Sequence, residues 1–466
     1  MEIRDFRPKY HFTPVYGWNN DPNGLIVHDG VWHMYYQHNP NDTIWGPMHW
    51  GHAASADLIH WEHKPIALAP DGDVTCYSGS MVYDANNTSG FGRDGIAPLV
   101  AVYTAHDMSV HTEVQHIAYS LDGGTTFTKY EGNPVVTAPI ISGEVLRDFR
   151  DPKVFWNTKK DRWCMVVAAF DRCHFYASSD LKHWEKTGEF AHGYADVPNC
   201  WACTDLTCYD TPDGERWVLL ASMECRPNDP ESRTMYIVGE FDGDTFRAID
   251  RPERPLWVDF GWDNYAGVSF NDADRPIMIG WGANPLYANM TPTGANGFRG
   301  GMTFAREMFL IKCEKGYRLG FKPINVPLTK AEKITSECFG VKVTGTNGAV
   351  TLGNEDGECV TVTVKDGELI ADRSKAGIND FELHPDHPVP SAIHMEPGFM
   401  NEEYSVRRVE RNAKGDIDML MLFDVSYLEI YADGGLETGS MVVYPKKPYT
   451  SVTATGGLKT ELYTIG

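Results

Sequence analysis

A short motif recurs four times in the first 250 residues: an aspartate followed within five residues by an aromatic side chain. The copies are Asp57–Trp61, Asp122–Phe127, Asp180–Trp184 and Asp242–Phe246. They are about 60 residues apart, and a serine stands shortly before three of them, at Ser55, Ser120 and Ser179. Four short strands with their turns occupy about 60 residues, so each period predicts one blade of a β-propeller. Chance recurrence of hairpin turns is the alternative explanation.

The segments between the copies favour strands. Apolar and β-branched residues cluster in short runs such as Val31–Gln37, Ala97–Thr104 and Arg216–Ser222, each followed by turn-forming residues, and helix signals are scarce. Five blades of this length would occupy residues 1–320. The fold class predicted from the sequence is therefore all-β.

The sequence pattern of the chain changes after residue 320. Residues 321–332 carry two prolines and are predicted to form a linker. In the remainder, residues 333–466, the segments Val360–Ser374 and Asp418–Gly435 each indicate a pair of strands, the first around a turn at Asp366 and Gly367. This tail predicts a β-sandwich beside the propeller.

The charge balance restricts the partners. The 64 acidic residues outnumber the 41 basic ones, giving a net charge of −23, so we expect neither nucleic acid nor an anionic membrane as partner. Neutral substrates remain compatible with this charge, and an aromatic content of 12% suits a cleft that stacks on sugars. No apolar run approaches the roughly 18 residues of a membrane-spanning helix.

The first ten residues, MEIRDFRPKY, lack the apolar core of a signal peptide. We therefore expect a cytoplasmic protein, unless a secretory leader has been removed. The 10 cysteines are scattered, and reduced thiols are expected rather than a disulfide framework. Cys200, Cys203 and Cys208 form C-x2-C-x4-C without a fourth ligand at suitable spacing, so no metal site is expected. Nothing in the sequence indicates a cofactor.

Two aspartates stand before prolines in motifs that can carry chemistry. In WNNDPNGL (Trp18–Leu25), Pro22 biases Asp21 toward an extended conformation at the end of a strand, and Asn23-Gly24 predicts a tight turn. In FRDPKVFW (Phe149–Trp156), Asp151 also precedes a proline and follows Arg150, which should hold it ionised. Each motif alone would be read as a turn. Together, about 130 residues apart in a repeat protein, they place two carboxylates on different blades facing one axis.

These motifs resemble glycoside hydrolase family 32, which contains the invertases, inulinases and levanases. The resemblance also includes Tyr77-Ser78-Gly79-Ser80, YAGVSF around Tyr265, FRGGMTFAREM before the linker, and DRS at Asp372–Ser374 in the tail. It runs over nearly the whole chain. It implies a five-bladed β-propeller followed by a C-terminal β-sandwich. This agrees with the repeat in the first 250 residues and with the change of sequence pattern after residue 320.

The resemblance also implies roles for individual residues. Asp21 matches the nucleophile that attacks the anomeric carbon of a β-fructofuranoside, and Asp151, with Arg150, matches the transition-state stabiliser. The residues that match the lining of the fructose pocket are Asn20, Gln37, Trp45, Ser78 and Trp281. Tyr265 and Tyr103 are further candidates for the same wall.

The third catalytic group is missing. The family has a glutamate, the acid/base catalyst, in a Glu-Cys-Pro-Asp motif, and the matching segment here reads Ala202-Cys203-Thr204-Asp205. Another Glu-Cys pair, Glu224-Cys225, lies about 20 residues too late and lacks the flanking residues, so we do not assign it this role. Ala202 is explained either by engineering that inactivates the enzyme or by a natural non-catalytic relative.

The function that the resemblance implies is that of a retaining β-fructofuranosidase acting on the terminal fructose of sucrose, fructo-oligosaccharides, inulin or levan. Because of Ala202, we expect this chain to be nearly inactive. The alternatives are a fructosyltransferase, including one that forms a cyclic difructose, and a non-catalytic fructan-binding protein. Asn284-Pro285 stands where the family often has an aromatic residue, which affects the wall that meets the second sugar.

Overall fold

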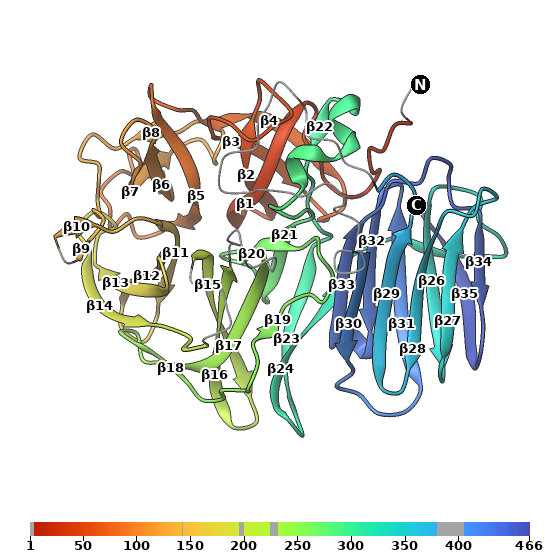
Figure 1. Cartoon of the computed structure of the whole chain (residues 1–466). Helices are drawn as coiled ribbons and strands as arrows, with labels where there is room; N and C mark the ends of the chain where they lie inside the picture. Colours follow the sequence, from red (N-terminus) through yellow and green to blue (C-terminus); the bar gives the residue numbers. More distant parts are fainter. Residues whose placement is uncertain (1–3, 142, 195–199, 224–231, 380–404) are drawn as a thin grey trace.

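The computed structural model describes residues 4–141, 143–194, 200–223, 232–379 and 405–466, and its architecture is built almost entirely from strands. Five antiparallel sheets are arranged around a common axis, and a pair of larger sheets lies beside them (Figure 1). The predicted five-bladed propeller and C-terminal sandwich are confirmed.

The blades follow one another along the chain. Blade 1 contains β1 (Gly17–His28), β2 (Val31–Asn39), β3 (His49–Ser55) and β4 (Trp61–Leu68). Blade 2 contains β5 (Val74–Tyr83), β6 (Leu99–Asp107), β7 (Thr112–Ser120) and β8 (Thr128–Lys129). A small hairpin, β9 (Ile140–Ile141) and β10 (Glu144–Val145), leads to blade 3, which contains β11 (Phe149–Asn157), β12 (Arg162–Ala169), β13 (Arg172–Ser178) and β14 (Glu185–Phe190).

Blade 4 contains β15 (Trp201–Thr211), β16 (Gly214–Met223), β17 (Arg233–Phe241) and β18 (Phe246–Ala248), with β19 (Leu256–Trp257) paired to β17. Blade 5 contains β20 (Tyr265–Ser269), β21 (Ile277–Trp281), β23 (Arg306–Cys313) and β24 (Gly316–Pro323). Between β21 and β23 lie two short 3-10 helices, η1 (Ala288–Met290) and η2 (Pro292–Asn296), and β22 (Phe298–Arg299). Strand β22 pairs in parallel with β1, so the end of the propeller is joined to its beginning.

The recurring aspartates occupy equivalent turns between the third and fourth strands of blades 1 to 4. In blade 1, Oδ1 of Asp57 accepts the N–H groups of Ile59 (2.9 Å) and His60 (2.8 Å). Asp122, Asp180 and Asp242 accept backbone N–H groups in the same way. The preceding serines, Ser55, Ser120 and Ser178, also accept backbone N–H groups, so in blade 3 the residue is Ser178 rather than its neighbour Ser179. The repeat is therefore structural, and chance recurrence does not explain it.

The sandwich has two sheets. One contains β25 (Leu328–Ala331), β35 (Leu458–Ile465), β26 (Cys338–Gly345), β31 (Ile417–Asp424), β32 (Tyr427–Ala432) and β33 (Glu437–Val442), with the 3-10 helix η3 (Asp433–Gly435) between the last two. The other contains β30 (Val406–Glu410), β29 (Glu368–Lys375), β28 (Cys359–Lys365), β27 (Gly348–Gly353) and β34 (Ser451–Ala454). Alternate residues of both sheets are buried between them, as expected for a sandwich.

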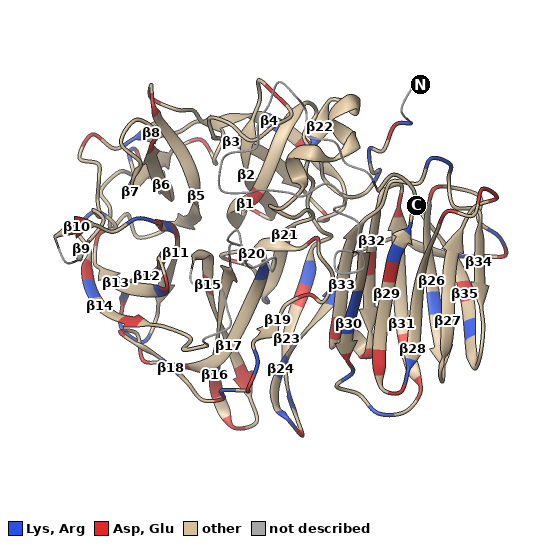
Figure 2. Cartoon of the chain, in the orientation of Figure 1, with Lys and Arg blue, Asp and Glu red and all other residues tan. Residues whose placement is uncertain are grey.

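The two domains meet along an extensive boundary. The last propeller strand, β24, continues to Pro323, and β25, which lies within the expected linker, already pairs with β35 of the sandwich. The N-terminal segment also reaches the sandwich, because Asp424 accepts the backbone N–H groups of Lys9, Tyr10 and His11. Figure 2 shows both acidic and basic residues on strands near this boundary, among them β23 and β29.

Within the described residues, nine cysteines are free thiols, and His, Cys, Asp and Glu side chains form no group of three or more that could hold a metal ion. The same part of the chain contains no helix long and apolar enough to cross a membrane.

Candidate active site

The innermost strand of every blade contains a β-bulge. The register shifts lie between Asn19 and Pro22 in β1, Cys76 and Gly79 in β5, Arg150 and Lys153 in β11, Ala202 and Asp205 in β15, and Tyr265 and Val268 in β20. These five strands surround the centre of the propeller (Figure 1). A bulge re-aims the side chains near it. Asp21, Ser78, Asp151 and Cys203 all lie inside these interruptions.

Asp21 is half-buried on β1 and receives hydrogen bonds at both carboxylate oxygens. Its Oδ2 accepts from the Ser78 hydroxyl at 2.6 Å and lies 3.3 Å from Sγ of Cys203. Its Oδ1 accepts from Nδ2 of Asn20 at 3.0 Å. The expectation that Asp21 ends a strand before a turn is wrong, because β1 continues to His28 through a second bulge in which Gly24 has a φ of +51°.

Asp151 has a left-handed backbone, with a φ of +63°, instead of the extended conformation expected before a proline. Its surroundings hold it in this form: its N–H donates to Oγ1 of Thr104 (2.8 Å), and its Oδ2 accepts the N–H of Cys203 (2.8 Å). Such a conformation costs about 1–3 kcal/mol for a residue other than glycine and is found mainly where neighbouring groups enforce it.

The protonation of Asp151 also differs from the expectation. Burial raises the pKa of this carboxyl, Arg150 offsets the rise only in part, and the charge of Asp21 adds to it, so the pKa is about 7. Arg150 lowers the pKa of Asp151 only in part because its Nε lies 3.7 Å from Oδ2 of Asp151, too far for a hydrogen bond. Its NH1 instead binds Asp148 at 2.6 Å and Glu113 at 3.4 Å.

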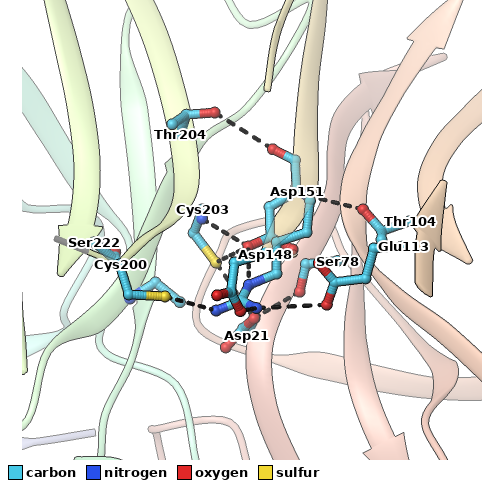
Figure 3. A network of polar contacts seen from close by, with 12 residues as sticks. Asp21, Ser78, Thr104, Glu113, Asp148, Asp151, Cys200, Cys203, Thr204 and Ser222 are labelled. Carbon is cyan, nitrogen blue, oxygen red and sulfur yellow. Dashed lines mark hydrogen bonds and ion pairs between the residues drawn. The ribbon is translucent and has the colours of Figure 1, made fainter. Parts of the chain in front are cut away.

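Cys203 connects the two aspartates (Figure 3). Besides its backbone bond to Asp151, its thiol lies 3.3 Å from Oδ2 of Asp21 and 3.6 Å from Oδ2 of Asp151. Burial and both neighbouring carboxylates raise the pKa of this thiol, so it stays protonated and can donate to them. Ala202 directly precedes it, is buried, and packs in one cluster with Trp18, Tyr265 and Trp281. Position 202 is therefore one residue away from the thiol that touches both carboxylates, and it presents only a methyl group.

Aromatic residues form the wall next to Ala202. Trp281 on β21 is paired with Tyr265 on β20, with ring centroids 6.4 Å apart, and the ring centroid of Trp18 lies 5.6 Å from that of Trp281. Nε1 of Trp18 donates to Asn20 at 2.8 Å, which orients the amide that binds Asp21. Trp45 is only partly buried and packs edge-on against Tyr77.

Two residues of the predicted lining are buried and make contacts that the sequence did not indicate. Tyr103 lies in the core between blades 1 and 2, against Trp50 and His116, and is not part of the wall. Gln37 is buried, and its Nε2 donates to the backbone oxygen of Cys76 at 2.9 Å, just before the bulge of β5. In the described structure, Gln37 thus supports the strand that carries Ser78.

Glu224 lies outside the described residues, so its expected distance from Asp21 stays a prediction. The late position of Glu224 in the sequence does not by itself place it far from position 202. Strand β16 folds back antiparallel to β15, so Ser222 is paired directly with Ala202 although 20 residues separate them. Sequence separation is therefore no measure of distance at this hairpin.

Some groups of the site were missed by sequence reasoning. Cys203 was noted only as part of a cysteine motif and as a neighbour of Ala202, although its thiol touches both aspartates. Thr104 and Glu113, on β6 and β7, carried no motif that pointed to the site; Thr104 accepts from Asp151, and Glu113 binds Arg150. The only signal in the sequence was their place in the blade that precedes the FRDP motif.

Profiles of known families match almost the whole chain. That of the glycosyl hydrolases family 32 N-terminal domain matches residues 11–323, and that of the family 32 C-terminal domain matches residues 322–464. The chain belongs to glycoside hydrolase family 32. A levanase of Bacillus subtilis is 36% identical to it over 503 aligned residues, which cover 96% of this chain and 72% of the levanase.

Solved structures of family 32 share the fold along the full chain. The exo-inulinase of Aspergillus awamori superposes with a TM-score of 0.86 at 29% identity, covering 100% of this chain and 99% of the inulinase. A fructofuranosidase of Schwanniomyces occidentalis in which a glutamate is replaced by alanine, complexed with fructosylnystose, gives a TM-score of 0.81 at 27% identity, with 98% and 97% of the two chains covered. The family inferred from the motifs is confirmed.

Proposed function

We propose that this chain binds the terminal fructose of sucrose, fructo-oligosaccharides or fructans in the site around Asp21, and that Ala202 blocks efficient hydrolysis. The observation that carries the proposal is the position of Cys203. Its thiol touches both Asp21 and Asp151, and the adjacent residue 202 lies against the aromatic wall. Two carboxylates therefore share one site, and an alanine stands next to it where the family match implies a third carboxyl group.

Asp21 is the nucleophile in this proposal. Hydrogen bonds from Ser78, Asn20 and Cys203 fix its carboxylate in one orientation. Attack on the anomeric carbon of the fructoside forms a fructosyl ester and breaks the bond to the leaving oxygen. Water then cleaves the ester from the same side as the departed sugar, so the configuration is retained.

The leaving oxygen needs a proton as its bond breaks. Asp151, whose pKa is raised to about 7, is partly protonated near neutral pH, but its Oδ2 already accepts the N–H of Cys203, and we assign it the role of transition-state stabiliser.

The neighbouring carboxyl groups Glu113 and Asp148 are poorly suited to supply the proton. Burial alone would raise the pKa of Glu113, but Arg150 and His106 outweigh it, so the pKa of Glu113 is lowered and the group is ionised. Asp148 is paired with Arg150. Ala202 has no proton to give. General acid catalysis contributes about 10²–10⁴-fold, so this chain should turn over sucrose very slowly.

The test is to restore the carboxyl group. We expect Ala202→Glu to raise sucrose turnover by about 10²–10⁴-fold. An aryl fructoside with an acidic phenol as leaving group needs less protonation, so its turnover should rise much less. Unchanged sucrose turnover in Ala202→Glu would show that position 202 is not the acid/base position.

A second variant tests the other glutamate of the sequence. In the Ala202 chain, Glu224→Gln should leave the residual turnover of sucrose unchanged if Glu224 takes no part. A large loss of this turnover would instead assign the proton donor to Glu224.

The products separate hydrolysis from the alternatives. Free fructose alone indicates exo-hydrolysis, whereas longer or cyclic fructosides indicate transfer to a sugar. Transfer to a sugar is the second candidate function because of residues 284 and 285. Asn284 is fully buried, and its Nδ2 donates to the backbone oxygen of Trp262. Asn284 and Pro285 therefore provide no aromatic ring that could meet a second sugar. Binding of fructosylnystose without turnover by either form would indicate a fructan-binding protein.

A further inference from the structure

The aromatic pair Tyr265 and Trp281 is connected to the domain boundary through the segments next to it. Asp263 lies two residues before Tyr265, and Tyr287 lies six residues after Trp281. Between them, Nδ2 of Asn284 donates to the backbone oxygen of Trp262 at 2.8 Å. The hydroxyl of Tyr287 donates to Oδ1 of Asp263. The two segments that lead away from the pair are therefore cross-linked to each other.

A buried arginine of the sandwich closes this cross-link. Arg373 on β29 is 2% exposed; its NH1 donates to Oδ2 of Asp263 at 2.7 Å, and its NH2 donates to the Tyr287 hydroxyl at 3.2 Å. Asp263 also accepts the backbone N–H of Val442 on β33 at 2.8 Å. The sandwich thus holds both segments through one guanidinium and one strand.

We propose that Arg373 is a positioning residue for the sugar-binding wall formed by Tyr265 and Trp281. The inference rests on the proposed function, because it assumes that this wall meets the sugar. In this proposal the sandwich affects the affinity for the substrate. Arg373 holds Asp263 and Tyr287 in place, and a shift of either residue would move the rings of Tyr265 and Trp281, which are a few residues away in the sequence. Truncating Arg373 would leave Asp263 buried without its cation, so milder changes are needed for the test.

A second network at the same boundary provides a matched control. Arg306 on β23 is fully buried and binds Asp259 at 2.9 Å and Glu429 at 3.1 Å, and the hydroxyl of Tyr431 donates to Glu429. Both networks contain a buried arginine, a carboxylate and a tyrosine hydroxyl. Tyr431 and Glu429 lie on β32 of the sandwich. This network also reaches the segment of Tyr265, because Asp259 accepts from Nδ2 of Asn264 at 3.2 Å, but the Tyr431 hydroxyl binds Glu429 and not Asp259. Removing this hydroxyl therefore acts less directly on the aromatic pair.

The experiment compares Tyr287→Phe with Tyr431→Phe in the full chain with Ala202. Each change removes one hydroxyl from one network. We expect Tyr287→Phe to weaken the binding of fructosylnystose by about tenfold, measured by calorimetry. Tyr431→Phe should lower the melting temperature to a similar extent but change the Kd less than twofold. Arg373→Lys, which keeps the charge but not the two-pronged geometry, should resemble Tyr287→Phe.

Near-ultraviolet circular dichroism gives a readout that does not depend on sugar. The signal that Trp281→Phe removes should change in Tyr287→Phe and stay unchanged in Tyr431→Phe. Equal effects of the two tyrosine variants on Kd and on this signal would overturn the inference. If the parent chain fails to bind fructosylnystose, the proposed function is wrong, and the dichroism comparison alone then decides whether Arg373 positions the wall.

Discussion

Strands β27 and β28 of the sandwich pair residue for residue without a shift, whereas β15 and β16 of the propeller lose register between Ala202 and Asp205. In the sandwich, alternate side chains such as Val350, Leu352 and Val362 are completely buried. In the propeller, the irregular stretches point Asp21, Ser78 and Asp151 toward a shared site. Regular strand pairing places alternate apolar side chains in the core, whereas the β-bulges turn polar side chains toward the axis of the propeller.

The difference teaches that stability and chemistry depend on different parts of this chain. A buried carboxyl with a left-handed backbone, as at Asp151, makes the folded state less stable. The compensating burial is located elsewhere, in regular strands with apolar cores. Four substitutions test this division.

The largest effect is expected at Asp21, the proposed nucleophile. In the Ala202→Glu background, Asp21→Asn should lower sucrose turnover by about 10³-fold or more, because an amide does not form the fructosyl ester. The free energy of unfolding should change by no more than about 1 kcal/mol. Turnover and denaturant unfolding, measured on the same preparations, check both statements. Retained turnover would remove Asp21 from the mechanism.

The sandwich core should give the opposite result. Leu352→Ala removes a fully buried side chain and should lower the free energy of unfolding by about 2–5 kcal/mol. The Kd for fructosylnystose should stay within twofold, because Leu352 belongs to the core between the two sandwich sheets and β28 separates its strand from that of Arg373. Lys365→Ala, at an exposed position of β28, is the control and should shift stability by less than about 0.5 kcal/mol. A weakened Kd in Leu352→Ala would contradict the division.

Asp151 should show that a site residue opposes stability. Its pKa is raised to about 7 in the folded protein, above the ordinary value of about 3.9. The stability that its protonated form contributes is fully present below pH 4 and is lost as the pH rises through 7. Asp151→Asn does not titrate, so its stability relative to the parent should improve by about 4 kcal/mol between pH 4 and pH 8. Denaturant unfolding at both pH values tests this, and a constant difference would refute the raised pKa.

The smallest effect is expected at a repeat turn. Asp57→Ala removes the acceptor of two backbone N–H groups and should lower the free energy of unfolding by about 1 kcal/mol. Asp57→Asn keeps an acceptor oxygen and should lose less. Both variants should bind fructosylnystose like the parent. Equal losses in the two variants would show that these hydrogen bonds do not stabilise the turn.

Sequence patterns predicted the features that repeat or alternate. The spacing of Asp57, Asp122, Asp180 and Asp242 indicated blades because each aspartate forms its turn from neighbours in the sequence. The sandwich strands followed from alternation, which is also local. The motifs around Asp21 and Asp151 identified the two carboxylates and, through the family resemblance, the fold.

The features that the sequence did not reveal depend on contacts between blades. The left-handed backbone of Asp151 is held by Thr104 of the preceding blade and by Cys203 of the following one. The pKa of Asp151 depends on how far Arg150 is drawn toward Asp148 and Glu113. Such groups meet only after the ring of blades is assembled, so no local pattern encodes them.

The pairing of β22 with β1 has a consequence for biosynthesis. Strand β1, which carries Asp21, begins with Gly17 and Trp18. These two residues pair with Phe298 and Arg299, about 280 residues later. At roughly 5–20 residues per second, a ribosome takes tens of seconds to make the chain between them. Throughout that time β1 presents an unpaired edge, which is open to wrong pairing. The first strand to emerge is thus among the last to be completed, and a truncated or stalled chain carries Asp21 without its finished surroundings.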